Sequence, residues 1–373
     1  FYIICTFNQP TVISVFLTKI SIINYKNISD KEYELDPKIN CFVGNNGVGK
    51  TNILDAIYHL SMGKSYFNVK NDQLIKNTKN YMLIDGVFKL NDKNEGIVCS
   101  LKIGEKKVLK RNGKAYKKFS NHIGLIPVVI ISPYDNDLIN DGSSERRKFI
   151  DSIISQNDKE YLTNLIAYTR VIQNRNKLLK QYNKSVDFDL DTIRVYDDQI
   201  FKLSDPIFKV REKFIQDFTP LVLEKYKQIS DDKEKISITY KSDLINNSIN
   251  DLIRDSFQKD VILQYTSTGL HKDDFIFNLD DNRIKKFGSQ GQQKSFLIAL
   301  KLAQFDYLKN KTGNSPILIM DDIFDKLDLL RVKRIVEMVN STNFGQLFLS
   351  DTDKGRIDKV LSGLNLTSKI FEL

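Results

Sequence analysis

Apolar and polar positions alternate along the first part of the chain, which is the pattern of β-strands. In LTKISIINYKNI and again in ELDPKINCFV, within residues 17–43, apolar or β-branched side chains occupy every second position. The spacing then changes, because Ile53, Ile57 and Leu60 recur at helical intervals. This predicts a helix that ends at Gly63.

Further strands are expected after this helix. Asn112-Gly113 in VLKRNGKAYKKF predicts a tight hairpin turn. PVVIIS at 127–132 predicts a buried strand, and DGSSERRKF opens a helix with Ser144 as the expected N-cap. From there to about residue 228 the periodicity is helical, which predicts an α-helical insertion.

An α/β alternation returns after Val261: a strand, a Gly/Gln turn, a long helix, a strand, a helix and a final strand. The pattern thus predicts an α/β fold interrupted by a helical arm. Sustained heptads are absent, so the arm cannot be a long coiled-coil rod. A length of 373 residues fits two domains, or one large domain with an insertion.

Composition narrows the class of protein. With 41% hydrophobic and 28% charged residues the chain is globular, and no apolar run approaches the roughly 20 residues of a membrane-spanning helix. The three cysteines, Cys5, Cys41 and Cys99, are odd in number and far apart, so we expect neither disulfides nor zinc sites. Reduced cysteines fit a cytoplasmic location, which we therefore expect. A formal charge of +9 permits a polyanionic partner.

The segment after the second predicted strand carries the most specific chemistry. It fits GxxxxGK[ST] and stands between a strand and a helix, as a phosphate-binding P-loop does. Its glycines let backbone N–H groups turn onto phosphate oxygens, and a Gly-rich turn without a ligand is the competing interpretation. Its residues are Gly44, Asn45, Asn46, Gly47, Val48, Gly49, Lys50 and Thr51. Lys50 would pair with ATP phosphates, and Thr51 would ligate Mg²⁺.

A second acidic element complements the P-loop. The apolar run Ile317 to Met320 suits a strand buried on both faces, and it ends abruptly in Asp321-Asp322. Ligands bind at the carboxyl ends of such strands. Asp321 is therefore the expected metal partner, and Asp322 is expected to orient or deprotonate the attacking water.

A third element is FGSQGQQK, followed by the helix SFLIALKLAQFDYLK, which we expect to be amphipathic. Ser289 and the N–H groups that open this helix form another anion-binding end. Two such ends far apart in sequence mean either two sites or one site shared between two copies. A polar helix cap without a ligand is the alternative.

The order of these motifs resembles the ABC-type ATPase head shared with SMC proteins. Within that group the chain is most similar to the RecF family of DNA repair proteins. LTKISIINYKNI, GSSERRKFID, QNRNKLLKQ, TGLHKDDF, SQGQQKS and DDIFDKLD all carry the resemblance, which runs through nearly the whole chain from about Leu17. The fold implied is an ABC-type P-loop ATPase head with an inserted α-helical arm.

The resemblance implies an ATP-dependent homodimer, in which ATP on one P-loop is closed over by Ser289, Gly291 and Gln292 of the other copy. Asp328, in a Leu-Asp turn, would lie near that interface. Such clamps bind single-stranded and double-stranded DNA at gaps or junctions. They work with RecO and RecR to load RecA, which links replication, recombinational repair and the SOS response.

The resemblance also divides the chain. Residues 1–14 are an extension of uncertain status, 15–135 form the first half of the head, 136–262 the arm, and 263–373 the second half. ABC ATPases usually carry Glu where Asp322 stands. RecF-like proteins also use Asp there, and the shorter side chain predicts slow hydrolysis. The resemblance further implies that DNA stimulates the hydrolysis. No Q-loop glutamine follows PVVIIS.

Other family positions depart from the usual residues. Ser350, Asp351 and Thr352 stand where transporters have a switch histidine. Leu270 and Lys272 replace the more usual Pro and Arg beside His271, which leaves the role of this histidine open.

A basic hairpin is the candidate DNA contact. Its candidate residues are Lys106, Lys107, Lys110, Arg111 and Lys114, which could neutralise phosphates with little sequence readout. A solvated lysine-rich hairpin is the alternative. Arg146 and Arg147 could serve DNA, nucleotide or a structural ion pair.

Three other classes of protein fit the sequence less well. A nucleotide-binding transporter subunit would have a smaller helical insertion, an SMC-like chromosome protein needs a long rod, and a P-loop nuclease needs a further cluster of acids. The sequence favours an ATP-gated DNA clamp.

Overall fold

The computed structural model describes residues 15–373 except 68, 183–189, 231–233, 323–344 and 363–365. The described chain divides into two compact units. The first unit contains residues up to Pro133 together with Gln304–Leu373, and the second unit is Tyr134–Ala303. The domain boundaries at 136 and 262 stay a prediction. The strands Ile236–Lys241 and Asp274–Leu279 lie on either side of residue 262 and pair with each other, so both belong to the second unit.

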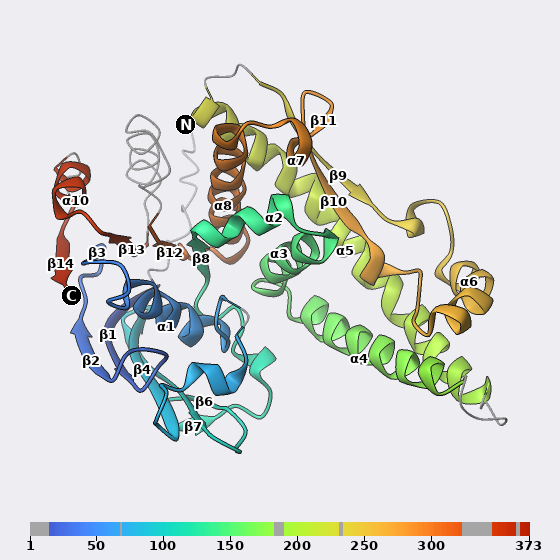
Figure 1. The fold of residues 1–373 in the computed structure, drawn as a ribbon, viewed down its shortest axis with the longest axis horizontal. Coiled ribbons are helices and arrows are strands. Elements are labelled where there is room, and N and C mark those ends of the chain that lie inside the picture. The colour runs from blue at the N-terminus through green and yellow to red at the C-terminus, as the bar shows by residue number, and fades with distance from the viewer. Residues whose placement is uncertain (1–14, 68, 183–189, 231–233, 323–344, 363–365) are drawn as a thin grey trace, which may run out of the picture. The chain divides into compact units, whose positions relative to one another are not determined.

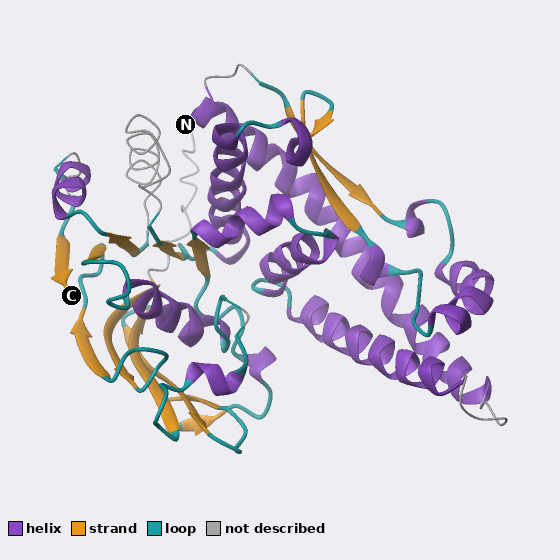
Figure 2. Cartoon of the chain, in the orientation of Figure 1, coloured by secondary structure: helices purple, strands orange, loops and turns teal. Residues whose placement is uncertain are grey.

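Two sheets build the first unit (Figure 2). The six-stranded antiparallel sheet has the order β2-β1-β4-β5-β6-β7, and the five-stranded parallel sheet has the order β14-β3-β13-β12-β8. The antiparallel strands are β1 Val15–Ile23, β2 Asp30–Glu34, β4 Tyr81–Leu90, β5 Lys93–Lys102, β6 Val108–Arg111 and β7 Lys114–Ala115. The parallel strands are β3 Ile39–Val43, β8 Val128–Ile131, β12 Ile317–Met320, β13 Leu347–Asp351 and β14 Ser368–Glu372.

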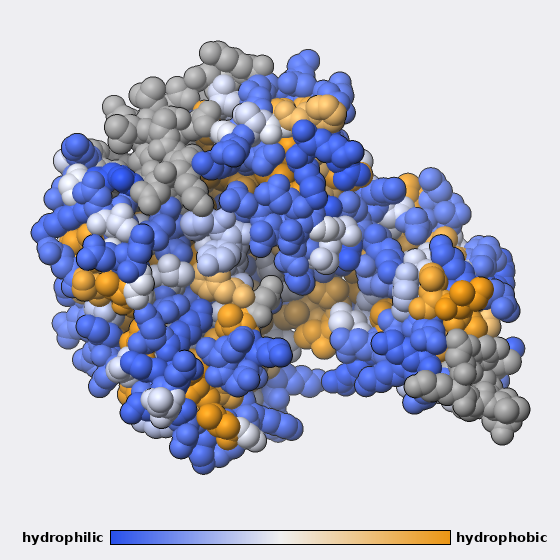
Figure 3. Space-filling model, viewed as in Figure 1, coloured by the Kyte–Doolittle hydropathy of each residue, from blue (hydrophilic) through white to orange (hydrophobic). Residues whose placement is uncertain are grey.

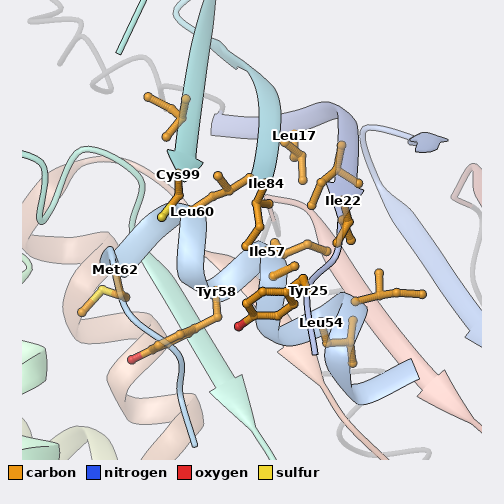
Figure 4. Packing of buried hydrophobic residues seen from close by; sticks show 14 of the residues in the cluster. Leu17, Ile22, Tyr25, Leu54, Ile57, Tyr58, Leu60, Met62, Ile84 and Cys99 are labelled. Atoms are coloured by element: carbon orange, nitrogen blue, oxygen red, sulfur yellow. The ribbon is translucent and has the colours of Figure 1, made fainter. Parts of the chain in front are cut away.

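Helix α1 (Lys50–Met62) packs against strands of both sheets (Figure 1). Its apolar face, with Ile57 and Leu60, meets Leu17 and Ile84 in the core of the first unit (Figure 4). The packing is close, because a Cβ atom on Gly86 would lie 2.5 Å from Leu60 Cδ1. Burial of this face explains why the spacing of apolar residues predicted the helix.

A buried glutamine ties the two sheets of the first unit together. Gln346 accepts a hydrogen bond from the backbone N–H of Leu17 and donates to the carbonyl of Leu17, both at 2.7 Å. It also donates to the carbonyl of Asp36 at 2.7 Å. The side chain therefore satisfies both backbone polar groups of Leu17 near the start of β1.

Helices dominate the second unit. They are α2 Asp137–Asn140, α3 Ser143–Ser155, α4 Lys159–Tyr182, α5 Leu190–Ser230, α6 Ile249–Leu263, α7 Ile284–Phe287 and the first part of α8 Gln290–Thr312. A three-stranded antiparallel sheet of the order β11-β10-β9 accompanies them, built from β9 Ile236–Lys241, β10 Asp274–Leu279 and β11 Asn282–Arg283. In the first unit, α10 (Lys354–Leu361) follows β13.

A buried arginine holds the second unit together. Arg211 on α5 donates to Asp151 at 3.0 Å and to Asp273 at 2.8 Å, and it also meets the hydroxyl of Tyr161 at 3.0 Å. Tyr240 donates to the same Asp273 at 2.6 Å. Removing one partner of such a buried network is strongly destabilising, because an uncompensated charge is left behind.

Several predictions of local structure are confirmed. Helix α1 ends at Gly63, which has a left-handed φ of 63°. Asn112 and Gly113 form the turn between β6 and β7 with φ of 49° and 77°, as a tight hairpin turn requires. The apolar runs at 127–132 and 317–320 contain the buried parallel strands β8 and β12.

Two local predictions are wrong. The N-cap of α3 is Gly142 rather than Ser144, because the helix already begins at Ser143. The helix α8 is not amphipathic: every residue from Ser295 to Phe305 is buried, so no solvent face selects polar side chains there. Lys301 is accommodated by an ion pair with Asp135 at 2.7 Å.

No helix among the described residues is long and apolar enough to cross a membrane. The face seen in Figure 3 is mostly hydrophilic, with small separate apolar patches. Cys41 and Cys99 are buried free thiols whose pKa values burial raises, to about 12 and about 11. Cys5 and the extension 1–14 lie outside the described residues.

Candidate nucleotide site

The predicted P-loop connects β3 to α1. Gly47 and Gly49 have φ of 86° and 110°, a left-handed region that side chains rarely tolerate. Asn27 supports the loop from behind, because its amide donates to the carbonyl of Gly47 at 3.1 Å. A Cβ atom on Gly49 would lie 3.1 Å from Asn27 Oδ1. Both glycines are therefore required by the shape of the loop.

Lys50 folds back across this loop. Its ammonium donates to the carbonyls of Gly44 at 2.8 Å and Asn45 at 3.2 Å, and the residue is 4% exposed. An ammonium carries three donors, so these carbonyls use two of them. The first residue of α1 thus brings a positive charge to the inner side of the loop, where the helix dipole also favours an anion.

The acidic strand end lies beside the start of α1. Asp321, 2% exposed at the end of β12, accepts a hydrogen bond from Thr51 Oγ1 at 3.0 Å. Its second donor is Ser350 Oγ at 2.7 Å. Burial raises the pKa of Asp321, and the neighbouring Asp322 adds to the rise. The structure therefore brings together the two elements that the sequence separates by 270 residues.

This pair fits a magnesium ion that is shared with a nucleotide. A hydroxyl and a carboxylate are hard oxygen donors, and Mg²⁺ is commonly held by one or two such groups together with phosphate oxygens. No group of three or more His, Cys, Asp or Glu side chains among the described residues could hold a metal alone. The donor set of Thr51 and Asp321 thus suits a metal that arrives with ATP.

The Ser289 segment opens α8 in the second unit. The Ser289 N–H donates to Gln292 Oε1 at 2.6 Å, and the Gln292 N–H donates to Ser289 Oγ at 3.2 Å. This reciprocal pair is a capping box, which fixes the first turn of the helix around Gly291. The Gln292 amide also donates to Glu234 at 2.7 Å. Asp328 lies outside the described residues.

Only part of the positive charge of the basic hairpin is exposed to solvent. Lys106, Lys110 and Lys114 are exposed. Arg111 instead forms a bidentate ion pair with Glu95 at 2.8 and 2.9 Å. The fifth candidate, Lys107, contacts the buried side chain of His59.

Lys107 is half-buried and lies 3.5 Å from His59 Nε2. Burial lowers the pKa of Lys107. Desolvation, with Lys107 as the next cause, lowers the pKa of His59 to about 3. The two side chains therefore form an internal contact rather than a surface for phosphate.

Arg146 and His271 both make contacts inside the second unit. Arg146 pairs with Asp274 on β10 through bonds of 2.7 and 3.1 Å, and Arg147 donates to the carbonyl of Asp273. His271 meets the hydroxyl of Tyr168 at 3.0 Å and the carbonyl of Thr266 at 2.9 Å. These contacts favour the structural ion pair among the alternatives left open for Arg146.

Sequence reasoning missed a carboxylate behind the P-loop. Asp55 is fully buried and accepts from Lys26 and Tyr25, both at 2.6 Å, and from Ser65 at 2.7 Å. The signal was present, because Thr51, Asp55 and His59 recur every four residues and so share one face of α1.

The sequence of this chain is similar to the sequences of known proteins over nearly its whole length. A family model described as the RecF/RecN/SMC N terminal domain matches residues 16–368. A DNA replication and repair protein RecF from Flavobacterium johnsoniae is 54% identical over 357 residues, which cover 96% of this chain and 99% of the relative. The chain belongs to the RecF family. A RecF from Phocaeicola vulgatus is 45% identical over 359 residues, 96% of each chain.

Solved structures agree with this RecF assignment. RecF-ATP, described as a recombination mediator protein in the RecFOR pathway, superposes with a TM-score of 0.85 at 29% identity and covers 91% of this chain and 93% of its own. The complex RecF-ATPrS of the same pathway gives 0.86 at 28% identity, over 96% of each chain. An Smc head domain from Pyrococcus furiosus, 15% identical with a TM-score of 0.55, covers 96% of this chain and 93% of its own and shares the fold. The predicted α/β fold of an ABC-type head is confirmed.

Proposed function

We propose that this RecF family member is an ATP-gated DNA-binding clamp in recombinational DNA repair and replication restart. The observation that carries the proposal is the 3.0 Å hydrogen bond between Thr51 and Asp321. It joins a P-loop to an acidic strand end, which is the arrangement that nucleotide hydrolysis requires. The relatives named RecF, one of them with ATP, support the same conclusion.

The P-loop residues would hold ATP, and the hydroxyl of Thr51 and the carboxylate of Asp321 would face Mg²⁺. The metal, when bound, neutralises charge on the phosphates. Lys50 is positioned by the loop carbonyls to pair with a phosphate oxygen. Asp322 would orient or deprotonate the attacking water. Because its side chain is one carbon shorter than that of Glu, we expect weak turnover. We further expect DNA to stimulate this turnover.

Nucleotide would act through dimer formation. Ser289, Gly291 and Gln292 form a capped helix end that suits the phosphates bound to a second copy. Asp328 would lie near the same interface. Binding of ATP by both surfaces would shift the equilibrium toward a closed homodimer, since only the closed state makes both sets of contacts.

DNA, single-stranded or double-stranded, would be held by the exposed lysines of the hairpin through its phosphates. RecO-type and RecR-type mediators would connect the clamp to RecA loading and to the SOS response. The RecFOR pathway named for the structural relatives supports this assignment. A protein of this function acts where the chromosome is, so we place it in the cytoplasm.

ATP turnover of the purified protein should be measured with and without gapped DNA. We expect DNA to raise ATP turnover. If DNA binds the closed dimer more tightly than the monomer, it increases the population of the closed dimer, which is the state that hydrolyses ATP. A transporter subunit would be stimulated by its membrane partner and not by gapped DNA. Turnover that is indifferent to DNA at low salt would contradict the proposed function.

A further inference from the structure

Ser350 is the penultimate residue of β13, the strand that lies between the two halves of the nucleotide site. Its strand, β13, pairs in parallel with β3, which leads into the P-loop, and with β12, which ends in the two aspartates. The backbone N–H of Gly44 donates to the carbonyl of Asp351 at 3.3 Å. Ser350 is fully buried, so its hydroxyl needs partners inside the protein.

The hydroxyl bridges both aspartates. Ser350 Oγ donates to Asp321 Oδ1 at 2.7 Å and accepts from the backbone N–H of Asp322 at 3.0 Å. A hydroxyl has a single hydrogen, and here that hydrogen serves the carboxylate. One side chain therefore holds the carboxylate of one aspartate and the backbone of the next.

The bond to Asp321 sets the direction of its carboxylate. The oxygen that accepts from Ser350 also accepts from Thr51 at 3.0 Å. Two donors that approach from β13 and from α1 leave this carboxylate little freedom to rotate. The oxygen that faces Thr51 is thereby held in the position where a shared metal would need it.

The bond to Asp322 anchors a strained turn. Asp322 has a φ of 44°, in the left-handed region that costs a residue with a Cβ atom about 1 kcal/mol or more. Its N–H points to Ser350 Oγ, so the turn begins at a fixed point. The backbone direction at Asp322 decides where its carboxylate is aimed.

We propose that Ser350 is a positioning residue for ATP hydrolysis: its hydroxyl fixes Asp321 toward the metal and Asp322 toward the attacking water. The inference deepens the proposed ATPase function and rests on it. The Ser350 hydroxyl contacts the two aspartates, and it acts through them. Its chemistry is hydrogen bonding alone, with no proton transfer.

The test compares Ser350→Ala, Ser350→Thr and wild-type protein, with Ser204→Ala as a control that removes an equally buried hydroxyl, bonded only to a carbonyl of its own helix α5. Affinity for Mn²⁺ in the presence of ATP is measured by electron paramagnetic resonance, and kcat and KM for ATP are measured separately. A thermal melt of each variant checks the fold.

We expect Ser350→Ala to weaken Mn²⁺ binding and to lower kcat by roughly ten- to hundredfold, which is the range for a lost hydrogen bond to a charged group. KM for ATP should stay nearly constant, and Ser350→Thr should restore most of both losses. Ser204→Ala should behave as wild type.

If Ser350→Ala has the same Mn²⁺ affinity and the same kcat as wild-type protein, the inference is overturned while the ATPase assignment stays intact. Equal losses in the alanine and threonine variants would also overturn it, because they would show that the buried space, and not the hydroxyl, matters. Failure of wild-type protein to bind Mn²⁺ with ATP would overturn the proposed function itself.

Discussion

Removing the exposed charge of the hairpin should flatten the salt dependence of DNA binding. The change is the triple replacement of Lys106, Lys110 and Lys114 by alanine. These three were chosen because the structure leaves them exposed, whereas Arg111 is paired with Glu95. The hairpin itself should persist, since its strands pair through backbone groups that the change does not touch.

The magnitude follows from counterion release. Each phosphate that a lysine neutralises contributes about −0.9 to the slope of log K against log salt for duplex DNA. If all three lysines contact phosphates, the slope should become less steep by roughly 2.7, and by proportionally less if fewer do. Sequence preference should not change, because phosphate contacts carry no base readout.

Binding is measured by fluorescence anisotropy of a labelled duplex with ATP over a salt series. The control replaces Lys148, Lys209 and Lys213 by alanine, which removes the same three charges from exposed positions of the second unit. The control should keep the wild-type slope. Equal flattening in both variants would refute the assignment of the hairpin, since net charge alone would explain the effect.

Three further results are expected. Ser289→Arg should leave ATP affinity unchanged but block the ATP dimer in sedimentation; lost ATP binding would mean that the nucleotide site is not shared between copies. Asp322→Asn should trap a long-lived ATP dimer with turnover lowered about a hundredfold or more. Asn also tolerates a left-handed φ, so the change removes the charge without disturbing the backbone. Unchanged turnover would therefore exclude the Asp322 carboxylate from its proposed role. The free energy of unfolding should fall below pH 6.5, because burial lowers the folded-state pKa of His59 to about 3 and of His271 to about 4. The stabilisation is complete above the unfolded-state pKa and is lost as the pH falls toward the folded-state values. At pH 5 the loss should be about 2 kcal/mol for each histidine. Chemical denaturation at pH 7.5 and pH 5 checks this, and equal unfolding free energies would contradict it.

The sequence was sufficient wherever a signal is local. The glycines of the P-loop are required by left-handed φ values at Gly47 and Gly49, which depend on a few neighbouring residues. The turn at Asn112-Gly113 and the end of α1 at Gly63 have the same origin. Such features are encoded where they occur, so motif and spacing predict them.

Long-range pairing was not predictable from these patterns. The partners of Ser350 follow the carboxyl end of the neighbouring strand β12, 29 and 28 residues earlier in the chain. Lys107 contacts His59, which lies 48 residues earlier. Only the folded sheet order brings such residues together. The pairing of Arg111 with Glu95 is an intermediate case, because the hairpin register places Arg111 opposite Ile97 and so near Glu95.

The helix α8 shows the limit of periodicity. SFLIALKLAQF was expected to have a polar face, yet Lys301 and Gln304 are buried along with the apolar residues. A buried lysine paired with an aspartate looks, in the sequence, like one exposed position in a helical repeat. Periodicity therefore identified the helix but not its surroundings.

The central claim is that nucleotide controls a dimer that holds DNA. Sedimentation velocity of the purified chain with and without ATP and Mg²⁺, repeated with gapped DNA at several salt concentrations, tests it most directly. We predict a monomer that becomes a dimer only with ATP and then binds DNA with steep salt dependence, and a Lys50→Ala variant that stays monomeric. A chain that remains monomeric with saturating ATP and sediments free of DNA at low salt would contradict the account.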